Sequence, residues 1–144
     1  MRQEWKQHAL GEEENNMRKI IEVPYINQRV SYPTGCESVS ATMLLQYLGY
    51  EITVDEFIRN YVPCVPMQER DGQLYGPDPR KAFCGSPYDK DSFGCYAPVI
   101  CGALQKAVGD QYTVVDETGT SMQTLIEHYI DREMPVVFWA CIDM

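Results

Sequence analysis

The chain has 144 residues, of which 44% are hydrophobic and 23% are charged, so it can form one core and is too short for two ordinary domains. Its net charge of −9 argues against a nucleic-acid partner, because such proteins gather basic side chains on one surface. The longest apolar run, 136–142, is far below the roughly 20 residues that span a bilayer, so we expect no transmembrane segment.

The first 19 residues are polar and lack the periodicity of a helix that packs. We predict a polar N-terminal tail over 1–19 and a single domain over 20–144. The tail has no apolar stretch of the length that a signal peptide requires. The chain is therefore expected to be cytoplasmic or the mature form of an exported protein. Residues 20–26 look like a short extended segment that leads into a loop.

A helix is predicted over 35–48, because its apolar residues recur on one stripe and Gly49 supplies a stop. Thr34 and Glu37 have the spacing of a capping box, which would make Thr34 the N-cap and Cys36 the second helical residue. Free backbone amides and the helix dipole stabilise a thiolate in this place. Cys36 is therefore a candidate nucleophile, although a cysteine can also be a small buried core residue.

A second capping box, Thr53 with Glu56, predicts a short helix that ends near Tyr61, since Pro63 cannot continue it. Residues 62–95 are rich in proline and glycine and show no period, so we expect a long loop there. Loops of this length in compact domains are often functional, and the alternative is a flexible surface insertion.

The last third of the chain predicts two helices and two strands. The helices span 96–108 and 121–133, and a short strand lies between them at 112–115. Residues 136–142 are continuously apolar, which is typical of a strand buried on both faces. Such a strand needs a neighbour on either side.

The cysteines show no C-x-x-C pair and no nearby pair of histidines, so we expect no metal site and no cofactor. Cys64 and Cys84 could form a disulfide if the protein is exported. The six cysteines are Cys36, Cys64, Cys84, Cys95, Cys101 and Cys141.

The segments VPYINQ, YPTGCESVSATMLLQYLGY, GPDP, FGCYAPVI and PVVFWA occur in this order over 20–144. Together they resemble the papain-like cysteine peptidases related to the bacteriocin-processing, or double-glycine, peptidases. The resemblance implies an α+β papain-like fold. It also implies that the helix-rich, nucleophile-bearing half is present and that the β-sheet half is truncated.

This resemblance implies that Cys36 is the nucleophile and that Gln28 donates to the oxyanion together with the cysteine's own backbone N–H. The substrate would be a peptide or a protein. Asn27 could replace Gln28 as the donor if the loop has another register. The processing peptidases carry an acidic residue where this chain has Gly35, and their glutamine lies closer to the cysteine, so cleavage after a double glycine does not follow.

The catalytic histidine of the family, with the Asp or Asn that orients it, lies beyond the strand that matches 136–142. His128 is expected on the solvated face of its helix, and His8 lies in the tail. We therefore expect this chain to lack the general base and to be inactive alone, or to be part of a longer gene. The alternative is a catalytically silent binding or assembly module that pairs through 136–142 with another copy or a second chain.

Overall fold

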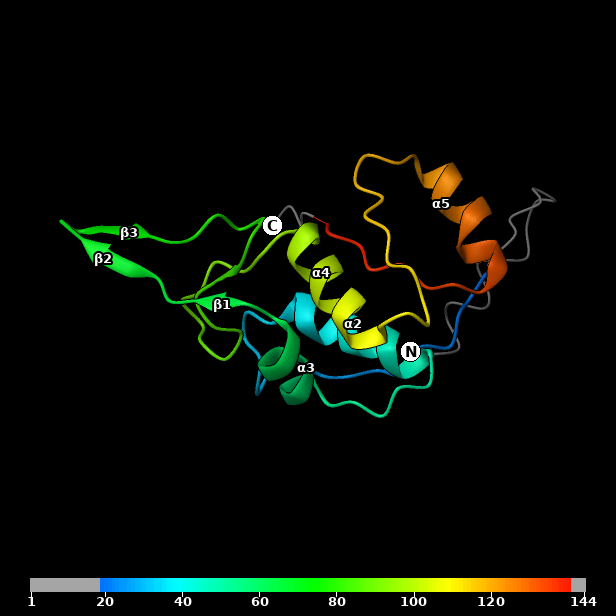
Figure 1. The fold of residues 1–144 in the computed structure, drawn as a ribbon, viewed down its shortest axis with the longest axis horizontal. Helices are drawn as coiled ribbons and strands as arrows, with labels where there is room; N and C mark the ends of the chain where they lie inside the picture. Colours follow the sequence, from blue (N-terminus) through cyan, green and yellow to red (C-terminus); the bar gives the residue numbers. More distant parts are fainter. Residues whose placement is uncertain (1–18, 141–144) are drawn as a thin grey trace, which may run out of the picture.

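The computed structural model describes residues 19–140, and three helices form the centre of this part. They are α2 (Cys36–Tyr47), α3 (Val54–Tyr61) and α4 (Ala97–Val108), and each packs against the other two. The hairpin of β2 (Gln68–Arg70) and β3 (Gln73–Tyr75) projects from one end of the molecule, and α5 (Met122–His128) lies toward the other end (Figure 1). None of the helices in 19–140 is long and apolar enough to cross a membrane.

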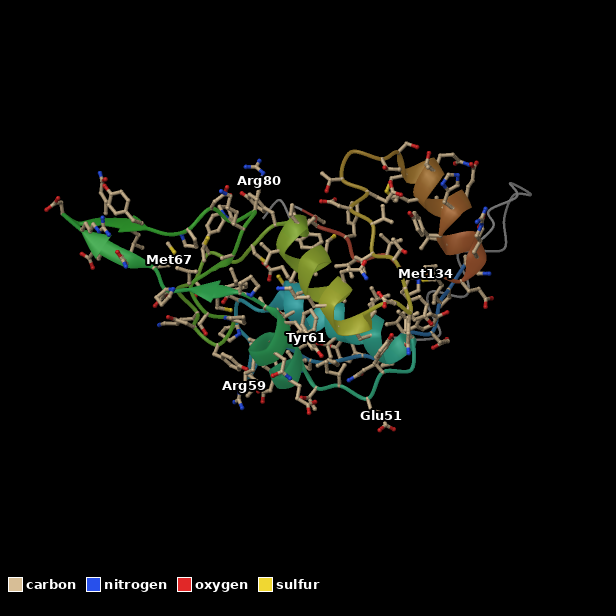
Figure 2. All side chains as sticks on the ribbon, in the orientation of Figure 1. Glu51, Arg59, Tyr61, Met67, Arg80 and Met134 are labelled. Carbon is tan, nitrogen blue, oxygen red and sulfur yellow. The ribbon has the colours of Figure 1, made fainter. Side chains whose placement is uncertain are left out.

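The core lies between these three helices and the strand β4 (Phe83–Cys84), where side chains fill the space (Figure 2). Burying a large apolar side chain of this kind contributes about 1.5–3 kcal/mol, so these contacts fix how the helices sit. The most deeply buried large apolar residues are Leu45, Phe57, Phe83 and Ile100.

The short helix predicted to begin at Thr53 and to end near Tyr61 is confirmed as α3, and so is its capping box. The Thr53 hydroxyl accepts a hydrogen bond from the Glu56 backbone at 3.2 Å, and the Glu56 carboxylate accepts one from the Thr53 backbone at 2.8 Å. Two amides that a helix start leaves without partners are thereby satisfied. The α3 helix ends at Tyr61, two residues before Pro63.

The helix predicted over 35–48 is also confirmed, but its predicted capping box is wrong. The N-cap is Gly35 and makes no side-chain capping bond, so Cys36 is the first helical residue and not the second. The side chains of Thr34 and Glu37 bond instead to the segment that follows β4, as described below. Long-range partners have replaced the local ones.

Residues 62–95 contain two small sheets, so the prediction of a loop without regular structure is wrong. In one sheet β1 (Cys64–Val65) pairs in parallel with β4 (Phe83–Cys84). In the other, β2 (Gln68–Arg70) pairs in antiparallel with β3 (Gln73–Tyr75) across a turn at 71–72. Every residue of the β2–β3 hairpin is exposed, so no buried period could have indicated it.

Cys64 and Cys84 are both free thiols in the structure, so the disulfide that the sequence left possible does not form there. In the β1–β4 register Cys64 lies opposite Phe83, while Cys84 lies opposite Val65. Because neighbouring side chains on a strand point to opposite faces, this offset places the two sulfurs on opposite faces of the sheet.

The predicted helix over 96–108 is confirmed as α4, and Gly109 ends it with a φ of 59°. The helix predicted over 121–133 is shorter than expected. It consists of α5 (Met122–His128) followed by a 3₁₀ turn (Ile130–Arg132), and its N-cap is Ser121. In this helix only Leu125 is buried, so most of its predicted inward face is not covered within the described residues.

Neither predicted strand in the last third forms within the described residues. Residues 112–115 and 136–140 have no strand partner, and 141–142 lie outside the described part. Phe138 is 64% exposed, so the expectation of a strand buried on both faces is wrong for 136–140. An apolar run becomes a buried strand only where neighbouring strands exist to pair with it. The predicted tail over 1–19 lies outside the described residues except for Lys19.

Candidate functional site

Cys36 is exposed at the N-terminus of α2 and follows two successive turns of the chain. The Tyr32 backbone N–H donates to the Gln28 carbonyl at 2.9 Å, and the Gly35 N–H donates to the Tyr32 carbonyl at 3.1 Å. These turns fold the 28–35 loop back on itself ahead of the cysteine. Gln28 is half-buried, and no hydrogen bond of its side chain is found among the described residues.

Gly35 is required by close packing in front of the nucleophile candidate. A Cβ added at this position would lie 2.9 Å from the Tyr32 Cβ and 3.1 Å from the Pro87 Cβ. Both distances are shorter than normal van der Waals contact, so the segment after β4 leaves no room for a side chain here. An acidic residue directly before Cys36 would not fit this arrangement.

Thr34 fixes the same loop to the segment after β4 through its hydroxyl. The Thr34 Oγ1 lies 3.1 Å from the Ser86 carbonyl and 2.7 Å from the Asp89 carbonyl, and it donates to them. A threonine that looks like an N-cap in the sequence is thus used to hold two chain segments together.

Asp55 on α3 is the acceptor of a three-residue clamp beside the 28–35 loop. Its Oδ1 accepts hydrogen bonds from Tyr88 at 2.7 Å and from Tyr32 at 3.1 Å, and the two tyrosine rings lie 5.7 Å apart. The bond from Tyr88, followed by the bond from Tyr32 and the charge of Arg59, lowers the pKa of Asp55. The clamp ties the loop that precedes Cys36 to a helix of the core. Sequence reasoning missed it, because none of these residues forms a local motif.

The Cys36 thiol donates a hydrogen bond to the carboxylate of its neighbour Glu37. The distance from Sγ to Oε2 is 3.2 Å. The other oxygen, Oε1, accepts from the Cys95 backbone N–H at 3.1 Å. Glu37 is only 9% exposed, so this carboxylate connects the start of α2 to the segment after β4 inside the protein.

These surroundings raise the pKa of Cys36 to about 11. Partial burial of the sulfur is the largest cause of this rise, and the charge of Glu37 and its hydrogen bond with the thiol add to it. The backbone amides of Glu37 and Cys36 lower the pKa, as expected at a helix start, but their effect is smaller. These surroundings favour the protonated sulfur over the thiolate that the helix start alone predicts.

The described residues place no imidazole beside Cys36. His128 is exposed on α5, which confirms its prediction as a surface residue, and His8 lies outside the described part. No group of three or more His, Cys, Asp or Glu that could hold a metal ion is present in 19–140.

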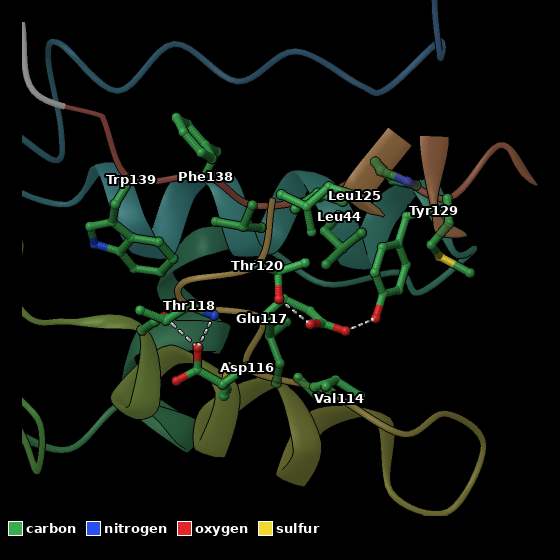
Figure 3. A pocket seen from close by; sticks show the side chains of 18 of the residues that line it. Leu44, Val114, Asp116, Glu117, Thr118, Thr120, Leu125, Tyr129, Phe138 and Trp139 are labelled. Atoms are coloured by element: carbon green, nitrogen blue, oxygen red, sulfur yellow. Dashed lines mark hydrogen bonds between the residues drawn. The ribbon is translucent and has the colours of Figure 1, made fainter. Parts of the chain in front are cut away.

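A cavity that Cys36 does not line lies between α2, α4 and the C-terminal segment. It has a volume of about 1060 Å³ and is lined mostly by apolar side chains. Leu44, Leu125, Phe138 and Trp139 lie around this space (Figure 3). The Trp139 Nε1 donates to the Cys95 carbonyl at 3.3 Å, which holds this segment near the residue that Glu37 binds.

Comparison with known proteins gives a consistent result. The model of the family described as "Peptidase_C39 like family" matches residues 20–143. The uncharacterised protein YvpB of Bacillus subtilis is 32% identical over 102 residues, which are 71% of this chain and 38% of that protein. A crystal structure from Bacillus anthracis, described as a C39-like peptidase, has a TM-score of 0.60 at 25% identity.

The alignment with the Bacillus anthracis structure covers 76% of this chain and 52% of that one. This likeness, with the mixture of helices and small sheets, confirms the predicted α+β papain-like fold. The chain spans about half the length of the solved structure and less of YvpB.

Proposed function

Because this chain belongs to the Peptidase_C39 like family, we propose that it is a cysteine peptidase-like hydrolase with Cys36 as its nucleophile and Gln28 as its oxyanion donor. The observation that carries the proposal is the position of Cys36. Its exposed thiol begins α2, and its own amide and that of Glu37 favour the ionised sulfur. Family membership supports the reaction class.

The reaction proceeds by acyl transfer to sulfur. The Cys36 thiolate attacks the carbonyl carbon of a peptide or amide bond, a C–S bond forms, and the carbonyl electrons move to oxygen. The oxyanion accepts hydrogen bonds from the Cys36 N–H and from Gln28, then collapses as the C–N bond breaks and the amine leaves with a proton. Water hydrolyses the thioester, which releases the acid and returns the proton to sulfur.

Gln28 is favoured over Asn27 as the donor by the local geometry. The Asn27 Oδ1 already accepts from the Arg29 backbone N–H at 3.1 Å, which turns this side chain toward its own loop. The backbone carbonyl of Gln28 accepts a hydrogen bond from the Tyr32 backbone N–H, and the Tyr32 hydroxyl in turn donates to Asp55. Loss of one such donor costs about 10²–10³ in rate, so Gln28→Ala should be far slower than Asn27→Ala.

The described residues around Cys36 include no imidazole that could be the general base of the proposed reaction. We propose that an imidazole from outside the described residues supplies it, and that this chain alone is slow. Such a base takes the thiol proton and later protonates the leaving amine. The proposed substrate is a peptide or protein. Cleavage after a double glycine is not part of the proposal, because Gly35 excludes the acidic residue of the processing peptidases.

The test is hydrolysis of an activated acyl ester and of fluorogenic peptides, with and without added imidazole. We expect slow turnover by the chain alone and faster turnover when imidazole is added. The Cys36→Ser variant should lose both the turnover and its increase with imidazole. Cys101→Ser is the matched control, because Cys101 is a free thiol on another helix, α4. Equal, imidazole-independent activity in the Cys36→Ser and Cys101→Ser variants would contradict the proposal.

A second function, pairing with another copy of the chain through 136–142, is favoured by one observation. Phe138 is 64% exposed in a segment without a strand partner, next to a largely apolar cavity. Phe138→Glu should then lower the mass measured by light scattering. Phe93→Glu is the matched control, because Phe93 is 61% exposed on a different segment. A wild-type protein that stays monomeric at high concentration would contradict the assembly role.

A further inference from the structure

We propose that Glu37 is a positioning residue that holds the Cys36 sulfur as a hydrogen-bond donor and keeps it protonated until a cationic partner offsets the carboxylate. The inference rests on the proposed role of Cys36 as nucleophile. It assigns a function to the residue directly after the nucleophile, which the proposed reaction does not use.

The geometry shows a carboxylate with both oxygens occupied. Oε2 accepts the thiol of Cys36 at 3.2 Å, and Oε1 accepts the backbone N–H of Cys95 at 3.1 Å. The space around Oε1 is closed, because a Cβ added at Gly94 would lie 2.6 Å from it. The Gly94 carbonyl in turn accepts from the Cys84 N–H at 2.9 Å, which fixes this segment to β4. Glu37 therefore holds the sulfur at a fixed place.

The described titratable groups that act on Cys36 or on Cys95 carry no positive charge. Besides Glu37, these groups are the thiols of Cys95, which follows β4, and of Cys84 and Cys64, which lie on β4 and β1. Burial raises the pKa of each thiol. The charge of Glu37 also raises the pKa of Cys95. Trp139, which approaches Cys95, donates a neutral N–H. Among the described residues, Glu37 is thus the one charged side chain that raises the pKa of Cys36.

The expected consequence is a thiol that is inert at neutral pH. A negative carboxylate beside the sulfur repels a thiolate, and a carboxylate in model peptides is a far weaker base than a thiolate, so the proton stays on sulfur. An imidazolium that approaches both groups would stabilise the thiolate and reverse this effect. Glu37 would thereby make ionisation of Cys36 depend on the arrival of the general base.

The experiment is alkylation of the native 144-residue chain with iodoacetamide, followed over pH, with the rate at each cysteine measured by peptide mass mapping. In the wild type, the Cys36 rate should keep rising without levelling off up to about pH 10. In Glu37→Gln, which keeps an oxygen for the Cys95 N–H, the midpoint should fall. For each unit by which the pKa of Cys36 falls, about ten times more thiolate is present at pH 8, but this thiolate is less nucleophilic. The alkylation rate at pH 8 should therefore rise about threefold per pKa unit.

Glu51→Gln is the matched control, because it removes the same charge from an exposed side chain that points away from the helices (Figure 2). It should leave the midpoint of Cys36 unchanged. An unchanged midpoint in Glu37→Gln, or a wild-type rate that levels off below about pH 9, would overturn the inference. If Glu37→Gln does not fold, the wild-type profile alone decides. Hydrolysis that survives Cys36→Ser would instead refute the proposed function, whatever the alkylation profile.

Discussion

Replacing Gly94 by alanine tests the packing around Glu37 directly. Gly94 has a φ of 99°, a backbone conformation that costs a residue with a side chain about 1–3 kcal/mol. The new Cβ would also lie 2.6 Å from Glu37 Oε1, so the carboxylate must move. The Cys95 N–H then loses its acceptor in the protein interior, which costs about a further 1–3 kcal/mol.

Gly49→Ala provides the matched comparison. Gly49 has a φ of 91°, but a Cβ there would meet nothing within 4 Å, so only the backbone cost applies. The free energies of unfolding of both variants can be measured by urea denaturation followed by circular dichroism. We expect Gly94→Ala to be less stable than Gly49→Ala by about 1–3 kcal/mol, the cost of the lost bond.

Adding Glu37→Ala to each variant isolates the contact. Without the carboxylate, Gly94→Ala should cost no more than Gly49→Ala, because the close approach is gone. Equal losses for the two glycine variants in the wild-type background would refute this account. So would an excess loss at Gly94 that remains when Glu37 is absent.

Three further outcomes are expected. Thr53→Ala should lower the free energy of unfolding by about 1 kcal/mol through loss of the α3 cap, whereas no change would contradict the capping box. The pKa of Asp55 is lowered, mainly by the hydrogen bond from Tyr88. The ionised carboxylate therefore stabilises the folded state above about pH 4, and this stability is lost as the pH falls through the pKa of Asp55 in the folded protein. Asp55→Asn should flatten this acid limb in pH-dependent melting. Deletion of 1–18 should leave the melting temperature unchanged if the predicted domain begins at residue 20.

The two capping boxes show how far local sequence can predict this fold. Thr53 with Glu56 forms the predicted box, because no other residue in the described part of the chain bonds to these side chains. Thr34 with Glu37 has the same spacing, but both side chains bond to the segment after β4. The Thr34 hydroxyl donates to a backbone carbonyl there, and the Glu37 carboxylate accepts from a backbone N–H. The helix boundaries were predictable in both cases, whereas the partners of the capping side chains were not.

The candidate site divides in the same way. Cys36 at a helix start and the glycine before it could be recognised from adjacent residues. The roles of Glu37 and Asp55 depend on Cys95 and Tyr88, which are 58 and 33 residues away along the chain, and the spacing of neighbouring residues does not indicate such contacts. The strand expected over 136–142 is absent from its described part, 136–140, for a related reason, since pairing depends on neighbours that the pattern of one segment does not contain.

The identity of the nucleophile is tested most directly by trapping the acyl intermediate. The protein would be mixed with an activated acyl ester in the presence of imidazole, quenched in acid and mapped by mass spectrometry. We predict a thioester on Cys36 that hydroxylamine removes, and its loss in Cys36→Ser. Acylation of other cysteines with Cys36 unmodified would contradict the account.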